Sequence, residues 1–320
     1  MLEVKDLKIR FPGAAGESRP VDGVTFGIAR GETFALVGES GCGKSLTSLA
    51  LVQLIPPPGR ILPDSSIRLE DRELIGLPEE ELRAIRGDRI GMVFQDPMTS
   101  LNPVLRIGDQ IAEGIRAHRK VSNRDALARA GQLLQEVGIP DPARRLREYP
   151  HQLSGGMRQR VMIAIALAAE PDLLIADEPT TALDVTVQAQ ILEILDHLRA
   201  VRGMSVLLIT HDLGIVAGRA DRVAVMYAGQ IVEETTTAQL FANPSHPYTR
   251  GLLASVPRLH GAAGRLKPIR GTVPSPDAWP EGCRFRPRCP EAFDKCIQHP
   301  PPLPVEKYHD MRCWLAERPR

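Results

Sequence analysis

The chain has 320 residues, of which 43% are hydrophobic and 25% are charged, and its formal net charge is only +1. This length exceeds one ordinary domain, and the balanced charge argues against a general attraction to nucleic acid. The longest apolar stretch, residues 161–169, is far shorter than the roughly 18 to 20 residues that cross a bilayer. Residues 1–6 already include three charged side chains and lack the apolar core of a signal peptide. We therefore expect a protein that stays inside the cell and has no membrane span of its own.

The hydrophobic pattern divides the chain into four parts. The first combines alternating strand patterns with a glycine-rich loop, and the second shows helical periodicity, with a helix expected at 124–137. The third returns to strands and contains an amphipathic helix with Ile191, Leu195 and Leu198 on one face. The fourth is a proline-rich extension. The four parts are residues 1–94, 95–168, 169–240 and 241–320. Strands alternating with helices predict an α/β fold.

The glycine-rich loop at residues 38–45 has the full pattern G-x-x-x-x-G-K-S and follows an apolar strand expected at 33–37. A strand before the loop and a helix after it are what a P-loop requires. Its glycines let backbone N–H groups turn toward phosphate oxygens, and the helix adds the positive end of its dipole. Lys44 is expected to reach the β- and γ-phosphates of ATP, and Ser45 to ligate Mg²⁺. The alternative is a glycine turn without nucleotide. The loop residues expected to contact ATP are Gly38, Ser40, Gly41, Cys42, Gly43, Lys44, Ser45 and Leu46.

Two acidic residues, Asp177 and Glu178, follow the apolar run at 173–176. The run indicates a buried strand that places both acids at its C-terminal edge. Asp177 is expected to hold Mg²⁺ through water. Glu178 points to the other side of the strand end and is expected to polarise the attacking water as a general base. A pair of solvated loop acids is the alternative.

Residues 153–160, Leu-Ser-Gly-Gly-Met-Arg-Gln-Arg, resemble the signature motif of ABC-type ATPases. The resemblance implies a P-loop NTPase with a RecA-like core, an antiparallel β-subdomain and a helical subdomain. It also implies that Ser154, Gly155 and Gly156 grip the γ-phosphate of the ATP bound to an opposite subunit. The chain would therefore work in a head-to-tail pair.

The same resemblance assigns four further residues. Gln95 would contact Mg²⁺ and sense a membrane partner. His211 would contact the γ-phosphate and hold the attacking water, so that Lys44, Gln95, Glu178 and His211 form the catalytic set. Asp184 ends a segment that resembles the D-loop. Phe11 matches the aromatic residue that stacks on adenine, with a core role in an alternating strand as the alternative.

Residues 246–253, His-Pro-Tyr-Thr-Arg-Gly-Leu-Leu, resemble a segment that follows the core in ATPases of dipeptide and oligopeptide importers, although they also suit a plain linker. Residues 95–103 and Met157 extend this resemblance to the D-type subunit. It implies a similar F-type ATPase subunit as partner in a heterodimer, two transmembrane permease subunits and, indirectly, an extracytoplasmic peptide-binding protein. It also implies a peripheral position on the cytoplasmic face of the inner membrane, and no nucleic acid.

The cargo is inferred from the family alone, because no residue of this chain is expected to touch it. Importers of nickel, glutathione or other solutes are therefore an alternative. A soluble ABC protein of translation or DNA repair is another.

Four of the five cysteines lie in the C-terminal extension, as Cys283, Cys289, Cys296 and Cys313. Disulfides are not expected in a reducing compartment, so clustered thiols indicate a metal site. Four thiolates suit zinc or a [4Fe–4S] cluster. The long spacings lack the C-x₂₋₄-C pairs of zinc sites, and the tails of the peptide-importer subunits carry [4Fe–4S], so we predict the cluster, as a structural staple. Zinc and free thiols are the alternatives.

Arginines lie between these cysteines. As a group they are expected to offset the negative charge of a thiolate cluster, and a solvated face is the alternative. They are Arg284, Arg286, Arg288 and Arg312.

Overall fold

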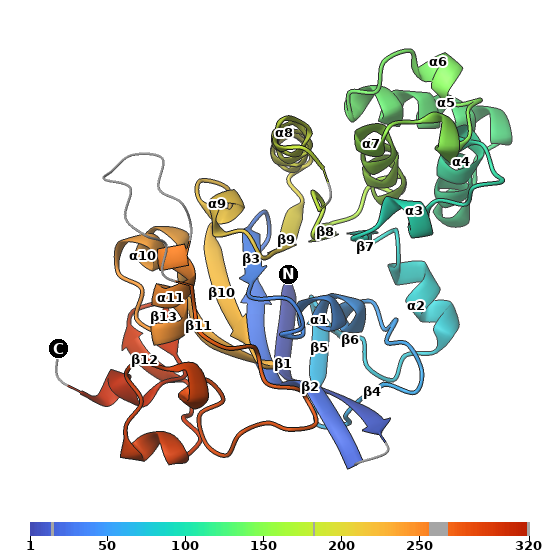
Figure 1. Ribbon diagram of the computed structural model, residues 1–320. Helices are drawn as coiled ribbons and strands as arrows, with labels where there is room; N and C mark the ends of the chain where they lie inside the picture. Colours follow the sequence, from blue (N-terminus) through green and yellow to red (C-terminus); the bar gives the residue numbers. More distant parts are fainter. Residues whose placement is uncertain (14–15, 182, 256–267, 319–320) are drawn as a thin grey trace. The chain divides into compact units, whose positions relative to one another are not determined.

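The computed structural model describes residues 1–13, 16–181, 183–255 and 268–318. Ala182, in the expected D-loop, and residues 256–267, in the expected extension, lie outside the described residues. The chain forms two compact units, shown in Figure 1. The first unit consists of Met1–Ile28, Thr33–Ile75 and Thr210–Arg320, and the second of Ala29–Glu32 and Gly76–Ile209.

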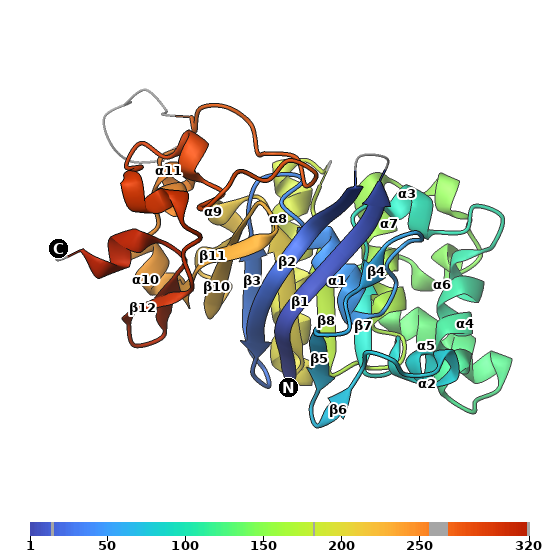
Figure 2. The same ribbon diagram turned by 90° about the horizontal axis from the view of Figure 1, so that it is seen from below.

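The first unit contains an antiparallel sheet with the strand order β2-β1-β5-β6, and β4 pairs with β1. Strands β1 and β2 form the long ribbon that is drawn in dark blue in Figure 2. Its apolar residues Val4, Leu7 and Ile9 are fully buried, and an irregularity in the strand pairing between Val4 and Leu7 changes the alternation there. The strands are β1 (Leu2–Gly13), β2 (Gly16–Ile28), β4 (Arg60–Ile61), β5 (Ser66–Leu69) and β6 (Arg72–Glu73).

The first unit also contains the strand that precedes the P-loop, and the C-terminal extension joins the same set of strands. Strand β3 pairs in parallel with β10, and β10, β11, β13 and β12 follow in antiparallel order. The extension is thus hydrogen-bonded to the core strands through the pairing of β13 with β11. The elements are β3 (Thr33–Val37), α1 (Lys44–Leu51), α9 (Leu213–Val216), β10 (Arg222–Tyr227), β11 (Gln230–Thr236), α10 (Thr237–Ala242), α11 (Pro247–Ser255), β12 (Leu303–Glu306) and β13 (His309–Met311), with short 3₁₀ helices at Arg286–Arg288, Asp294–Ile297 and Trp314–Glu317.

The second unit contains three parallel strands in the order β7-β8-β9 and a group of helices drawn in green in Figure 1. The helix expected at 124–137 is confirmed as α5, whose N-terminus is capped by the Ser122 hydroxyl. The amphipathic face of Ile191, Leu195 and Leu198 is also confirmed, because all three are buried in α8. The elements are α2 (Glu79–Ile85), β7 (Ile90–Val93), α3 (Pro97–Ser100), α4 (Ile107–His118), α5 (Asn123–Glu136), α6 (Pro142–Arg145), a 3₁₀ turn (Pro150–Gln152), α7 (Gly155–Ala166), β8 (Leu173–Asp177), α8 (Val185–Arg202) and β9 (Ser205–Thr210).

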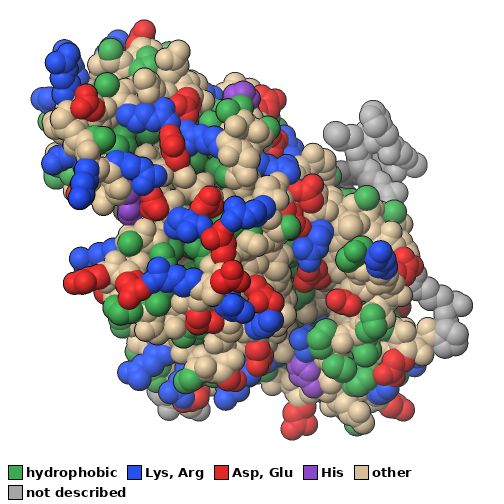
Figure 3. Space-filling model, turned by 180° about the vertical axis from the view of Figure 1, so that it is seen from behind, with side chains coloured by type: hydrophobic (Ala, Val, Ile, Leu, Met, Phe, Trp, Pro, Cys, Tyr) green, Lys and Arg blue, Asp and Glu red, His purple; other side chains and the backbone are tan. Residues whose placement is uncertain are grey.

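The architecture is α/β, with the antiparallel strands, the helical part and the C-terminal extension that the sequence predicts. The four-part division at residues 94, 168 and 240 stays a prediction. In the described part of the chain no helix is long and apolar enough to span a bilayer. Figure 3 shows basic and acidic side chains interspersed over one face, so neither sign forms a large patch there among the described residues.

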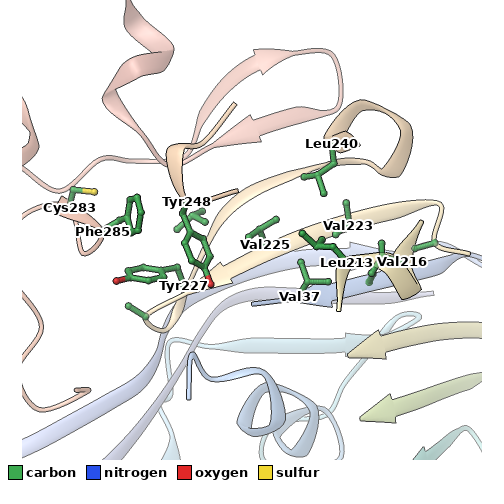
Figure 4. Packing of buried hydrophobic residues seen from close by; sticks show 14 of the residues in the cluster. Val37, Leu213, Val216, Val223, Val225, Tyr227, Leu240, Tyr248, Cys283 and Phe285 are labelled. Atoms are coloured by element: carbon green, nitrogen blue, oxygen red, sulfur yellow. The ribbon is translucent and has the colours of Figure 1, made fainter. Parts of the chain in front are cut away.

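An aromatic cluster attaches the extension to the core. Tyr227 ends β10, Tyr248 lies in α11, and Phe285 lies beside Cys283 in the extension (Figure 4). The ring centroids are 4.6 Å apart for the two tyrosines, and Phe285 lies 5.2 and 5.4 Å from them. Such tilted and edge-to-face rings add about 0.5 to 1.5 kcal/mol per pair beyond the burial of their area.

A fully buried carboxylate, Glu233 of β11, provides the polar part of this attachment. It accepts hydrogen bonds from the backbone N–H groups of Ser245 (2.7 Å) and His246 (2.9 Å), and its Oε1 lies 2.7 Å from Nε2 of His309 in β13. Burial alone would raise the pKa of Glu233, but these donors outweigh it and hold the pKa below its ordinary value. The carboxylate therefore ties three segments of the chain together.

Replacing Glu233 by Gln puts an amide N–H₂ where backbone N–H groups now donate. We expect a loss of about 2 to 3 kcal/mol in the unfolding free energy of the extension, because buried donors are left unpaired. Both tryptophans, Trp279 and Trp314, lie in the extension, so urea unfolding followed by tryptophan fluorescence reports on this region. Glu281→Gln, at an exposed position, is the control and should change stability by less than about 0.5 kcal/mol. Equal stability of the two variants would contradict this role of Glu233.

Candidate functional site

The P-loop is shaped by contacts that only glycine permits at two positions. It connects β3, which ends at Val37, to α1, which begins at Lys44. A Cβ on Gly38 would lie 2.2 Å from the carbonyl oxygen of Met226 in β10. Gly43 has a φ of +108°, and a Cβ there would lie 2.6 Å from the carbonyl oxygen of Pro20. The loop is therefore packed directly against the backbone of neighbouring segments.

Lys44 is buried, and its ammonium group is held by the loop itself. Its Nζ donates to the carbonyl oxygens of Gly38 (2.8 Å) and Glu39 (3.1 Å). The first turn of α1 contains no acidic residue, so no carboxylate of this turn opposes an anion at the helix N-terminus. Beside Lys44, Cys42 is fully buried, and this burial raises the pKa of its thiol. Cys42 thus packs as a small neutral side chain under the loop.

Three other predicted residues of the first unit have defined surroundings. Ser45 is half-buried in the first turn of α1. The ring of Phe11 in β1 is half-buried and lies against Gly59, where a Cβ would be 2.5 Å from the ring. His211 is exposed directly after β9 and before α9, whose N-terminus is capped by the side chain of Asp212.

In the second unit, the ends of β7 and β8 bring Gln95 and Glu178 together. The two strands are paired in parallel, with Val93 opposite Ala176. Nε2 of Gln95 donates to Oε2 of Glu178 at 3.1 Å, and the hydroxyl of Thr181 donates to the same oxygen at 2.8 Å. These donors orient the Glu178 carboxylate.

Both acids that were expected at a strand end lie there. Asp177 is the last residue of β8, and Asp177 and Glu178 are only 4% and 9% exposed. Glu178 has a φ of +45°, which is uncommon for a residue other than glycine. Its backbone N–H donates to the carbonyl oxygen of Ile209 (2.9 Å), which continues the pairing of β8 with β9. The alternative of two solvated loop acids is therefore wrong.

The signature residues begin α7, on the surface of the second unit. Ser154 is the N-cap residue, and its hydroxyl accepts a hydrogen bond from the N–H of Met157 (3.4 Å). Ser154 and Gly155 are exposed, and a Cβ on Gly156 would lie 2.6 Å from Cγ1 of Val187. The open N-terminus of α7, which has no acidic residue in its first turn, is a suitable binding place for an anion.

Asp184 caps the next helix, α8. Its Oδ1 accepts a hydrogen bond from the N–H of Val187 at 3.0 Å, and its side chain is otherwise exposed. The predicted residues therefore fall into two groups: the P-loop, Phe11 and His211 in the first unit, and Gln95, the signature, Asp177, Glu178 and Asp184 in the second. Their assignment to ATP and Mg²⁺ stays a prediction.

All four cysteines of the extension line one small cavity, together with His246, Phe285 and Leu315 among others. None of them forms a disulfide. Burial raises the pKa of the Cys283 thiol, that of Cys289 to about 11 and that of Cys313 to about 12. Across the described ranges, no three or more His, Cys, Asp or Glu side chains are arranged to hold a metal ion. The four cysteines thus converge on one cavity.

Comparisons with known proteins agree with this arrangement. Residues 21–181 match the family described as "ABC transporter", and residues 232–296 match the family described as "Oligopeptide/dipeptide transporter, C-terminal region". The chain is 53% identical over 318 residues to the "Oligopeptide transport ATP-binding protein AppD" of Bacillus subtilis (strain 168), covering 99% of this chain and 97% of that protein. It is 50% identical over 319 residues to the "Dipeptide transport ATP-binding protein DppD" of the same organism, covering 99% and 95%.

Solved structures of ATP-binding cassettes have the same fold over most of the chain. The dimeric, post-hydrolysis structure of the cassette MJ0796 bound to ADP and Pi is 29% identical in sequence, with a TM-score of 0.66. It covers 74% of this chain and 99% of that cassette. CbiO1 of Clostridium perfringens, part of the transporter complex CbiONQ, is 28% identical with a TM-score of 0.63, over 76% of this chain and 90% of that one.

Replacing Gly38 by Ala tests the close packing of the P-loop. We expect ATP affinity to fall by more than about tenfold and the melting temperature to fall as well, because a methyl group there must displace the backbone of β10. Isothermal titration with ATP and thermal unfolding measure the two effects. Gly27→Ala is the matched control, since its Cβ would lie at an ordinary 3.6 Å from the nearest atom. A Gly38→Ala variant that binds ATP as tightly as the Gly27→Ala variant would refute the packing argument.

Proposed function

Because the chain belongs to the ABC transporter family, and within it to the ATP-binding proteins of oligopeptide and dipeptide transport, we propose that it hydrolyses ATP to energise peptide uptake. The match of the C-terminal region carries the peptide assignment, since this region lies outside the ATPase core. The P-loop and the paired Gln95 and Glu178 support ATP hydrolysis.

The residues of the ATP site divide the chemistry between them. Backbone N–H groups of residues 38–45 and the N-terminus of α1 would surround the β- and γ-phosphates, and Lys44 would move its donors from the loop carbonyls to phosphate oxygens. Bound Mg²⁺, for which Ser45, Gln95 and Asp177 have suitable oxygen atoms, would neutralise phosphate charge. Phe11 would support the adenine.

Hydrolysis would depend on Glu178 and His211. The Glu178 carboxylate, already oriented by Gln95 and Thr181, would accept a proton from the attacking water, and His211 would hold that water against the γ-phosphate. Positioning and charge neutralisation supply most of the rate enhancement in phosphoryl transfer.

A second ATPase subunit is the first partner that we propose. Ser154 and Gly155 are exposed at the N-terminus of α7, Gly156 follows them, and no acidic residue lies in the first turn, which supports binding of an anion from another molecule. In a head-to-tail dimer it would bind the γ-phosphate held by the P-loop of the partner, with Asp184 near the contact. We propose that the partner is a similar F-type subunit.

Two permease subunits are the second proposed partner, and they would contact the region around α3. Apolar side chains are exposed there within a short stretch: Phe94 by 37%, Met98 by 64%, Val104 by 76% and Leu105 by 37%. Grouped exposed apolar residues indicate a protein contact. Because Phe94 directly precedes Gln95 and Met98 follows it within three residues, a permease bound there would act on the residue that holds Glu178. The chain would thus work on the cytoplasmic face of the membrane, and a peptide-binding protein outside the membrane would deliver the cargo.

The transport assignment is tested by reconstituting the chain with its partner ATPase and permease subunits in vesicles. ATP-dependent uptake of labelled dipeptides and oligopeptides is expected. Uptake of nickel or glutathione instead, with no uptake of peptides, would overturn the assignment.

We further propose that Cys283, Cys289, Cys296 and Cys313 hold a [4Fe–4S] cluster. All four line one cavity, four thiolates are the ligand set of a [4Fe–4S] cluster, and their separations in the sequence lack the C-x₂₋₄-C pairs that are typical of zinc sites. Burial raises the pKa of three of these thiols, so they are protonated near neutral pH, and binding of the cluster to the thiolates must release protons. The cluster would hold together a segment that is poor in apolar residues.

Replacing Glu178 by Gln tests the general base. The variant should still bind ATP, hydrolyse it at least about 100-fold more slowly, and accumulate as an ATP-bound dimer, because the amide cannot accept the proton of the attacking water. Phosphate release and size-exclusion chromatography with ATP measure these effects. Glu193→Gln, an exposed position in α8, is the control. Undiminished hydrolysis by the Glu178→Gln variant would remove this residue from its role.

Replacing Cys289 by Ser tests the cysteine centre. Wild-type protein purified without oxygen should contain about four irons and a matching amount of sulfide per chain and absorb near about 400 nm, and the variant should lose them. The control is Cys42→Ser, which should keep its iron because Cys42 lies in the P-loop. If the wild-type protein contains one zinc per chain and no iron, the cluster proposal is wrong and the zinc alternative holds.

A further inference from the structure

The P-loop, for which we propose phosphate binding, contains one carboxylate, that of Glu39. Arg288 of the extension pairs with it in a bidentate geometry, with Nη1 2.7 Å from Oε2 and Nη2 3.0 Å from Oε1. The Arg288 side chain is only 5% exposed and that of Glu39 is 31% exposed. A fork of two parallel bonds in partly buried surroundings is a strong form of ion pair.

Arg288 is held in place by further contacts inside the extension. Its Nε donates to the carbonyl oxygen of Arg270 (2.9 Å), and its Nη2 donates to that of Gly271 (3.2 Å). Its guanidinium lies over the ring of Tyr227, 5.7 Å from the centroid. The hydrogen bonds to Glu39 raise the pKa of Arg288, so the group is always charged. The extension therefore presents a fixed positive charge to the P-loop.

A second residue of the same region holds the backbone of Glu39. The N–H of Glu39 donates to Oη of Tyr248 at 3.0 Å, and Tyr248 is fully buried. The carbonyl of Glu39 accepts a hydrogen bond from Lys44. The side chain, N–H and carbonyl of this one residue thus each have a partner, and two of the three partners lie in the C-terminal region.

We propose that Arg288 is a positioning residue for ATP binding, which neutralises and orients Glu39 and so makes ATP affinity depend on the folded C-terminal extension. The proposal rests on the proposed ATP-binding function. An unpaired carboxylate beside the phosphates would repel them, because like charges at close range in a partly buried site are poorly screened. The sequence suggested that the arginines between the cysteines offset thiolate charge. The guanidinium of Arg288 is directed instead to the P-loop.

The test measures binding of the non-hydrolysable ATP analogue AMP-PNP, with Mg²⁺, to the full chain by isothermal titration. Arg288→Gln should weaken binding by about tenfold, because it leaves Glu39 unpaired. Arg288→Lys should recover part of this loss. The double variant Arg288→Gln, Glu39→Gln should bind within about threefold of wild type, because it removes the repelling charge as well.

The matched control is Arg250→Gln, which breaks a partly exposed ion pair with Glu291 elsewhere in the same region and should leave affinity unchanged. Equal affinity of wild type and Arg288→Gln would overturn the proposal. So would a loss that Glu39→Gln does not rescue, since that would show a purely structural role. Wild-type protein that binds no AMP-PNP would refute the proposed function itself, and the inference with it.

If the melting temperature shows that Arg288→Gln does not fold, the single variant Glu39→Gln tests the proposal by itself. It keeps the N–H contact with Tyr248 and loses a negative charge, so it should bind AMP-PNP at least as tightly as wild type. A tenfold loss of affinity in this variant would overturn the proposal.

Discussion

The close contact between the P-loop and β10 is the constraint on which much of the first unit depends. Gly38 lies so near the carbonyl of Met226 that no side chain fits between them. The next residue of β10, Tyr227, packs against Tyr248 and Phe285. One strand therefore contacts the phosphate-binding loop through its backbone and the C-terminal extension through a side chain. Because protein interiors are densely packed, a displacement of the P-loop or of the C-terminal extension would shift β10 and thereby the other of the two.

In the second unit, the main constraint is the orientation of the Glu178 carboxylate at the end of β8. Parallel pairing of β7 and β8 places Gln95 beside Glu178, and Thr181 supplies a second donor to the same oxygen. The exposed apolar residues around α3 lie on both sides of Gln95 in the chain. A short segment thus links the proposed docking surface for the permease subunits to the proposed general base, and through it binding of the permease would be coupled to hydrolysis.

The extension has a small apolar core, and polar contacts and cysteines complete it. Glu233 joins β11 to β13 and to the start of α11, while Arg288 joins the segment of Cys289 to the P-loop. A centre held by the four cysteines would restrain the same segment. Loss of the proposed cysteine centre and loss of the ion pair between Arg288 and Glu39 would therefore both loosen the segment that contains Arg288 and Cys289.

Local sequence patterns determined the strand, loop and helix of the P-loop, the position of α5 to within one residue at each end, the buried face of α8 and the position of Asp177 and Glu178. These features depend on periodicity, capping and glycine placement, which act over a few residues. The partners of Glu39, Glu233 and Arg288 were decided only by the tertiary structure. Glu39 and Arg288 are 249 positions apart in the chain. The local sequence around an arginine between cysteines is the same whether its guanidinium pairs with thiolates or with a distant carboxylate. Long-range charge pairing depends on how strands and loops pack, and no local pattern encodes it.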